Sequence, residues 1–203
     1  MIRDLASLAV IAAAAWWLYH NRAQVAGLIG EVRGALDPAP SANVDRTPGT
    51  GTRAWAYARQ AGVPARDQSL VAAMIEVESG GDPLAHNTAG EDSRGLMQVQ
   101  LSTARGLWDA DTGTLGLRRR FGRDDLGQAL FDPVWGVIIG YAYIRYLRDR
   151  VPDAYADAPE DWVIRAYNGG ETWHEKGTGV RAATLRYLEA IRAVQARQQS
   201  EAA

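Results

Sequence analysis

Glu78 is the first candidate for a catalytic proton donor in this sequence. Leu70 and Met74 precede it at intervals of four residues, and residues four apart lie on the same face of an α-helix. The spacing predicts a helix whose apolar face ends in a carboxyl group. Loss of hydration there would raise the pKa of that group, as a general acid at neutral pH requires. Glu76 lies about 200° around the same helix and is predicted to face solvent.

The position of Glu78 does not by itself establish an active site. A glutamate just before a Gly80-Gly81 pair is common at the end of a surface helix, and most acidic residues are solvated. The interpretation therefore depends on the surrounding elements and on further motifs.

Two helices are predicted around this position. The first covers residues 67–79 and ends at the glycine pair. The second begins at Asp132-Pro133, a capping carboxylate followed by a proline in the first turn. It continues to about residue 150 and is apolar almost all round, so it is expected to be the buried central helix.

Two further helices are predicted near the C-terminus. One covers residues 160–167 and is stopped by Asn168-Gly169-Gly170. The other covers about 180–198, with one apolar side formed by Leu185, Leu188, Ile191 and Val194. No alternation typical of strands stands out, so the fold class is predicted to be mainly α.

The N-terminal part of the chain differs in composition. Residues 5–19 are uncharged and apolar, with three aromatic residues at their C-terminal end, which favours a membrane anchor within residues 1–36 that contacts lipid through residues 5–28. A cleaved signal peptide and an alanine-rich packing helix are the alternatives. Residues 37–52 are rich in Pro and Gly and are predicted to be a flexible linker. Residues 53–203 are then the expected catalytic domain.

The overall composition excludes several functions. The chain has no Cys and three scattered His, so we expect no metal site and no other cofactor. A formal net charge of -2 gives no basic field of the kind that nucleic-acid binding requires.

Three separated motifs carry a resemblance to a known family. Glu78-Ser79, the Gly-Leu-Met-Gln sequence at 95–98 and the Ala-Tyr-Asn sequence at 166–168 resemble the signature motifs of the soluble lytic transglycosylases. The resemblance covers about residues 54–195. It implies a goose-type lysozyme-like fold and peptidoglycan glycan strands as the substrate.

The resemblance also implies a role for each matching residue. Glu78 is the expected catalytic acid/base, and Tyr167 is expected to form a hydrogen bond near it. Substrate contacts are expected for Ser79, Asn87, Met97, Gln98, Tyr167 and Asn168. At Asn87 this chain departs from the family, which usually has a Ser that contacts the N-acetyl region of the substrate. An amide can also supply that contact.

The reaction implied by the resemblance uses one carboxyl group. The N-acetyl group of the substrate assists, and closure of the muramyl C6 hydroxyl onto C1 leaves a 1,6-anhydromuramyl end. A hydrolysing muramidase is the first alternative, with Asp82, Glu91 or Asp92 as its second carboxylate. A virion or secretion-system assembly protein that retains the fold without the activity is the second.

The expected setting is the cell wall. A membrane-anchored chain would direct the catalytic domain toward peptidoglycan in the bacterial periplasm or in a phage virion, where envelope or virion assembly partners are possible. Residues 118–120 are three consecutive Arg that either meet the acidic peptide stem of the substrate or, as we prefer, form a solvated face.

Overall fold

A computed structural model describes residues 52–89, 91–111, 113 and 116–201. The predicted anchor at 1–36 and the predicted linker, apart from Thr52, lie outside the described residues. The division into anchor, linker and catalytic domain therefore stays a prediction. Within the described ranges, no helix is both long and apolar enough to cross a bilayer.

The described part is mainly helical, as predicted. Its main helices are α3 (Thr52–Gln60), α4 (Ala65–Ser79), α5 (Leu101–Ala110), α6 (Leu117–Arg120), α7 (Leu126–Ala129), α8 (Pro133–Arg148), α9 (Pro159–Gly169) and α10 (Thr178–Glu201). Two short 3-10 helices, η1 (Asp153–Tyr155) and η2 (Trp173–Glu175), lie in the connections on either side of α9.

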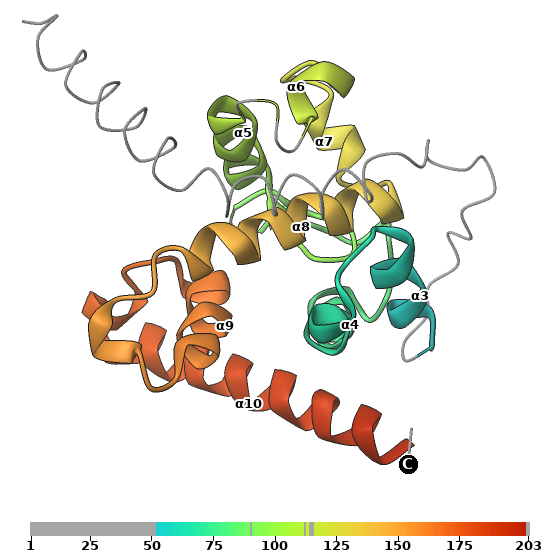
Figure 1. The fold of residues 1–203 in the computed structure, drawn as a ribbon. Helices are drawn as coiled ribbons and strands as arrows, with labels where there is room; N and C mark the ends of the chain where they lie inside the picture. The colour runs from blue at the N-terminus through green and yellow to red at the C-terminus, as the bar shows by residue number, and fades with distance from the viewer. Residues whose placement is uncertain (1–51, 90, 112, 114–115, 202–203) are drawn as a thin grey trace, which may run out of the picture.

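Helix α8 is the buried centre of the fold, as its apolar sequence predicted. It runs through the middle of the molecule, with α5 to α7 on one side and α4, α9 and α10 on the other (Figure 1). The carboxylate of Asp132 accepts hydrogen bonds from the backbone N–H groups of Val134 and Trp135, both at 3.0 Å. These bonds satisfy two donors that have no partner within the helix.

Helix α4 also forms where the apolar spacing placed it. Leu70 and Met74 are buried, and Gly80 ends the helix in the left-handed conformation, at φ +62°. A residue with a side chain is strained in that conformation, which explains the glycine at this position.

The buried face of α10 is only partly the predicted one. Ile191 is buried and Leu188 and Val194 pack against the core, as predicted, whereas Leu185 is 43% exposed. The face also contains Thr184, Tyr187 and Gln198, which the apolar pattern missed because they carry polar groups. The polar groups of Thr184 and Tyr187 are satisfied by hydrogen bonds across the helix interfaces, so their burial carries little cost.

The prediction that Glu76 faces solvent is wrong. Helix α10 packs against α4, and the side chain of Glu76 is only 13% exposed and forms an ion pair with Arg197. Helical spacing gives the direction of a side chain but not the distant segment that covers it.

A small antiparallel sheet was not predicted. It has the order β1 (His86–Asn87), β2 (Ser93–Arg94) and β3 (Val99–Gln100), and His86 lies opposite Arg94 in its register. Each strand has two residues, too few to show alternation in the sequence. The sheet brings Asn87 and the 95–98 motif to the end of α4 that carries Glu78.

Candidate active site

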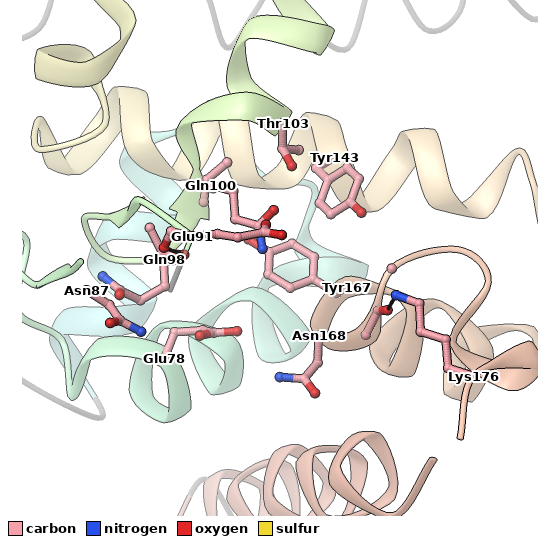
Figure 2. Close-up of a pocket in the computed structure, with 14 residues that line it drawn as sticks. Glu78, Asn87, Glu91, Gln98, Gln100, Thr103, Tyr143, Tyr167, Asn168 and Lys176 are labelled. Atoms are coloured by element: carbon pink, nitrogen blue, oxygen red, sulfur yellow. Dashed lines mark hydrogen bonds between the residues drawn. The ribbon is translucent and has the colours of Figure 1, made fainter. Parts of the chain in front are cut away.

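A polar cavity of about 480 Å³ lies between the end of α4, the small sheet, α8 and the turn that follows α9. Figure 2 shows the side chains that surround it. Most are uncharged hydrogen-bonding groups, which suits a ligand rich in hydroxyl and amide groups. The lining residues are Glu78, Asn87, Glu91, Ser93, Gln98, Val99, Gln100, Thr103, Tyr143, Tyr167, Asn168, Gly169, Gly170 and Lys176.

Glu78 occupies the last turn of α4 and faces this cavity. Its Oε1 accepts a hydrogen bond of 2.6 Å from the hydroxyl of Tyr187 on α10. Burial raises the pKa of the Glu78 carboxyl to about 7, although the bond from Tyr187 acts in the opposite direction. The group is therefore able both to donate and to accept a proton near neutral pH.

Ser79 connects the end of α4 to the 95–98 motif. Its Oγ lies within hydrogen-bond distance of the carbonyl oxygens of Ile75 at 3.0 Å and Leu96 at 2.9 Å. It also accepts a hydrogen bond from the N–H of Gly81. These contacts are within the protein, and Ser79 is not among the residues that line the cavity.

The 95–98 turn is held in an unusual backbone conformation. Gly95 has φ +72°, and a Cβ there would lie 1.9 Å from the carbonyl oxygen of Leu130, so only glycine fits. Gln98 has φ +45°, which is strained for a residue with a side chain. Its Nε2 donates to the carbonyl oxygens of Ala85 and Gly95, both at 3.0 Å. The turn thereby holds Gln98 at the cavity wall.

Met97 and Tyr167 join the turn to helices α8 and α9. The side chain of Met97 is fully buried against Gly140, where an added Cβ would lie 2.5 Å from its sulfur. The hydroxyl of Tyr167 donates to the carbonyl oxygen of Met97 at 2.9 Å. Tyr167 lines the cavity and Met97 does not, so the contact of Met97 with the site runs through its backbone.

The tyrosine hydroxyls near Glu78 stay protonated. Burial raises the pKa of Tyr167 and of Tyr187 well above 10, and the charge of Glu78 acts in the same direction. Burial also raises the pKa of Tyr143 to about 12, and its ring lies 5.2 Å from that of Tyr167. All three hydroxyls therefore keep their proton at neutral pH and are able to donate a hydrogen bond.

Asn87 and Asn168 supply amide groups from two sides of the cavity. Asn87 lies on β1, and its Oδ1 accepts a hydrogen bond of 3.0 Å from the N–H of Ala89. Asn168 is exposed near the end of α9. Four of the six predicted substrate-binding residues thus line one cavity with Glu78, whereas Ser79 and Met97 support it. Their contacts with substrate stay predictions.

The three loop acids are placed differently from one another. Asp82 accepts a hydrogen bond from the N–H of Leu84. Asp92 is bound by Arg94 and His86 at 2.6 to 2.8 Å, and its contact with Arg94 is the largest cause of a pKa lowered to about 2. Glu91 is the one of the three that lines the cavity, and it is exposed.

Sequence reasoning missed Tyr187, Tyr143 and Lys176. Tyr187 lies four residues before Ile191, on the buried face of α10, and this helical spacing was the available signal. Tyr143 belongs to the apolar helix α8, where the sequence pattern predicts that a tyrosine is part of the core. Lys176 lies in a turn where no periodicity applies.

Residues 56–185 match the family model described as Transglycosylase SLT domain. The match spans more than half of the chain, and the protein belongs to this family of peptidoglycan-cleaving enzymes. Searches of curated proteins and of solved structures gave no match. Tyr187 lies two residues beyond the matched range, so its contact with Glu78 comes from the structure alone.

Proposed function

We propose that the protein is a lytic transglycosylase that cleaves the β-1,4 bond between N-acetylmuramic acid and N-acetylglucosamine and leaves 1,6-anhydromuramyl ends. The observation that carries the proposal is Glu78, a carboxyl with a pKa raised to about 7, placed in a polar cavity. Peptidoglycan as the substrate follows from the family.

The proposed reaction needs one group that first donates a proton and then accepts one. Glu78 protonates the glycosidic oxygen as the bond from that oxygen to C1 breaks, and the N-acetyl carbonyl oxygen of the substrate bonds to C1. The Glu78 carboxylate then takes the proton of the muramyl C6 hydroxyl as O6 replaces the N-acetyl oxygen at C1. No water is consumed, and Glu78 ends protonated, ready for another cycle.

The arrangement of the other acids supports a one-carboxyl mechanism. Asp82 lies in the turn before β1 and accepts a hydrogen bond from Leu84, whereas Asp92 is held by His86 and Arg94. Neither acid lines the cavity with Glu78, so neither is placed there as a nucleophile. Tyr187 keeps the Glu78 carboxyl in one orientation through its 2.6 Å hydrogen bond. An oriented, partly desolvated acid is what protonation of a leaving oxygen requires.

A hydrolysing muramidase is the second candidate, and the position of Glu91 favours it. Glu91 lines the same cavity as Glu78, and a second carboxylate across a sugar site can activate water in an inverting glycosidase. The two candidates differ in their products, because hydrolysis adds one water to each cleaved strand.

Mass spectrometry of the released muropeptides tests the proposal. The full-length protein is incubated with purified sacculi, and each digest is analysed before and after borohydride reduction. The proposed reaction gives products one water lighter than hydrolytic ones, and borohydride leaves their anhydro ends unchanged. Reducible ends of full mass would establish the muramidase instead. The Glu78→Gln protein is the control for contaminating enzymes.

We also propose that residues 1–36 anchor the protein in a membrane with the catalytic domain facing the cell wall. The uncharged apolar run at 5–19 supports this. Full-length protein should sediment with membranes and keep its N-terminal sequence, whereas a chain that lacks residues 1–36 should remain in the supernatant. A mature N-terminus beyond residue 15 would identify a cleaved signal instead.

A further inference from the structure

Lys176 is the only lysine in the chain and the only cationic side chain among the described residues that line the cavity. It follows η2, in the turn between α9 and α10. The one-carboxyl reaction proposed above gives it no role. Its ammonium either binds a group of the ligand or only stabilises the turn.

The contacts of Lys176 leave its charge available. Its Nζ donates one hydrogen bond of 2.7 Å to the carbonyl oxygen of Gly169, whereas an ammonium carries three N–H donors. The side chain is exposed. The bond to Gly169 limits the freedom of the ammonium and holds it at the cavity edge.

The acidic residues nearest in sequence are bound elsewhere. Glu171 accepts a hydrogen bond of 3.0 Å from Tyr146 and lies 3.7 Å from Arg150, and Glu175 lies 3.7 Å from His174. Among the described residues, Lys176 forms no ion pair with a carboxylate. Neither Glu171 nor Glu175 therefore competes with a ligand carboxylate for the ammonium.

Lys176 lies on the far side of Asn168 from Glu78 (Figure 2). The two charged groups therefore act on different parts of a bound ligand. Gly170 lies beside Lys176 with φ +80°, and a Cβ there would lie 3.4 Å from Nζ. Gly170 therefore places no side chain against the ammonium.

The chemistry of the substrate identifies the group that an ammonium would meet. The sugar hydroxyl and N-acetyl groups of peptidoglycan are neutral. Carboxylates occur on the muramyl branch, either along the peptide stem or on the lactyl group where the stem has been removed. An ammonium that projects into a sugar cavity is suited to such a group.

We propose that Lys176 determines specificity by binding a carboxylate of the muramyl branch while Glu78 acts on the glycosidic bond. This inference rests on the proposed function for its substrate. Residues 118–120, for which a solvated face was preferred over contact with the peptide stem, lie outside the cavity. Arg118 donates to the carbonyl oxygens of Trp108 and Asp109, and Arg120 lies over the ring of Trp135.

The test compares Lys176→Gln and Lys176→Arg with the matched control Arg119→Gln in full-length protein. Arg119→Gln removes the same charge from an exposed side chain away from the cavity. For each protein, kcat and the half-saturating substrate concentration are measured on three substrates. These are native sacculi, sacculi whose carboxylates have been converted to amides with carbodiimide and ammonia, and glycan strands from which an amidase has removed the peptide stems.

On native sacculi, Lys176→Gln should raise the half-saturating concentration roughly 3- to 10-fold with little change in kcat, as expected for one partly exposed charged contact. Lys176→Arg should restore most of the loss, and Arg119→Gln should behave as wild type. On amidated sacculi, the difference between Lys176→Gln and wild type should disappear. An equal effect on native and amidated sacculi, or no effect on either, overturns the proposal.

The stripped strands identify the source of the carboxylate. If the effect of Lys176→Gln is lost on them, the carboxylate that Lys176 binds in native sacculi lies in the peptide stem. If the effect persists, Lys176 also binds the lactyl carboxylate that the amidase exposes, because that carboxyl is held in an amide bond wherever the stem is present. Both results support a carboxylate on the muramyl branch.

A binding measurement separates this proposal from the proposed reaction. Glu78→Gln and the double variant Glu78→Gln with Lys176→Gln are sedimented with native and amidated sacculi, so no turnover is required. Weaker binding of the double variant to native sacculi alone supports Lys176 even if the products prove to be hydrolytic. Equal binding of both variants overturns the Lys176 proposal and leaves the reaction to be judged by mass spectrometry.

Discussion

Two glutamates on the last turns of α4 meet the same neighbouring helix in different ways. Glu76 forms an ion pair with the guanidinium of Arg197 on α10. Glu78 accepts a hydrogen bond from the neutral hydroxyl of Tyr187, nearly three turns earlier on that helix. The residue type, the helix and the covering element are the same at both sites.

The partner from α10 therefore sets the behaviour of each carboxyl. A guanidinium supplies a full positive charge that pairs with a carboxylate, which suits a packing contact. A hydroxyl orients the carboxyl without supplying a charge. Burial then raises the pKa of Glu78 to about 7, so Glu78 is able to exchange protons near neutral pH. Glu76 instead stabilises the packing of α10 against α4.

The largest expected effect comes from changing each glutamate to glutamine. Glu78→Gln keeps the shape and can still accept the bond from Tyr187, but it cannot donate the proton, so turnover should fall at least ~10²-fold. Glu76→Gln is the matched control and should keep most of the activity. Muropeptide release from sacculi measures both. More than a tenth of wild-type activity in Glu78→Gln, with loss in Glu76→Gln, would show that the roles are reversed.

The same two variants should have opposite effects on stability at alkaline pH. A carboxyl with an unfolded pKa of 4.5 and a folded pKa of about 7 is protonated in both states below 4.5 and therefore has no effect there. As pH rises from 4.5 to 7, the unfolded state loses its proton first, so the folded state becomes relatively less stable. Above pH 7 the cost is constant, on the order of 3 kcal/mol.

Urea titrations at pH 4.5 and pH 8 measure this difference. Glu78→Gln should raise the free energy of unfolding at pH 8 and leave it nearly unchanged at pH 4.5. Glu76→Gln should lower it at pH 8 by about 1 kcal/mol or less, because the ion pair with the half-exposed Arg197 is lost. A Glu78→Gln protein that is no more stable than wild type at pH 8 would show that Glu78 is not held at a raised pKa.

Tyr187→Phe should lower turnover less than Glu78→Gln does, and it should change the pH dependence of the rate. The hydroxyl stabilises the charged form of Glu78, so its loss raises the pKa of that carboxyl further. The alkaline limb of the rate profile should therefore move to higher pH, and kcat at the optimum should fall roughly 10-fold as the carboxyl loses its orientation.

Arg197→Gln is the control for Tyr187→Phe. It removes a different polar contact between the two helices, outside the cavity, and should leave the alkaline limb where it is in wild type. A pH profile that moves in Arg197→Gln but not in Tyr187→Phe would mean that helix packing, and not the hydroxyl, controls Glu78.

The parts of the fold that periodicity determines were predictable from the sequence. The apolar stripe that ends at Glu78 and the cap at Asp132 are local features, and both helices form where the sequence places them. The three motifs place Glu78, Gln98 and Tyr167 in one cavity, although they are far apart in the chain.

The rest depends on contacts between distant segments. The partners of Glu76 and Glu78 both come from α10, more than a hundred residues along the chain, and no local pattern reports such a contact. The buried face of α10 contains Thr184 and Tyr187, which a search for apolar residues passes over. Lys176 reaches the cavity only because the turn after α9 folds back beside Gly169.

The smallest effect is expected for Glu91, the other carboxylate of the cavity. It differs from Glu78 in that it is exposed, and no described hydrogen bond from a tyrosine fixes its carboxyl. A base that activates water has to hold that water against the sugar, which requires a fixed carboxylate. Glu91→Gln should therefore change turnover less than about threefold and leave every product with an anhydro end. If the variant instead lost a fraction of reducible, full-mass ends that wild type produces, Glu91 would be the base of a hydrolytic branch in the same cavity.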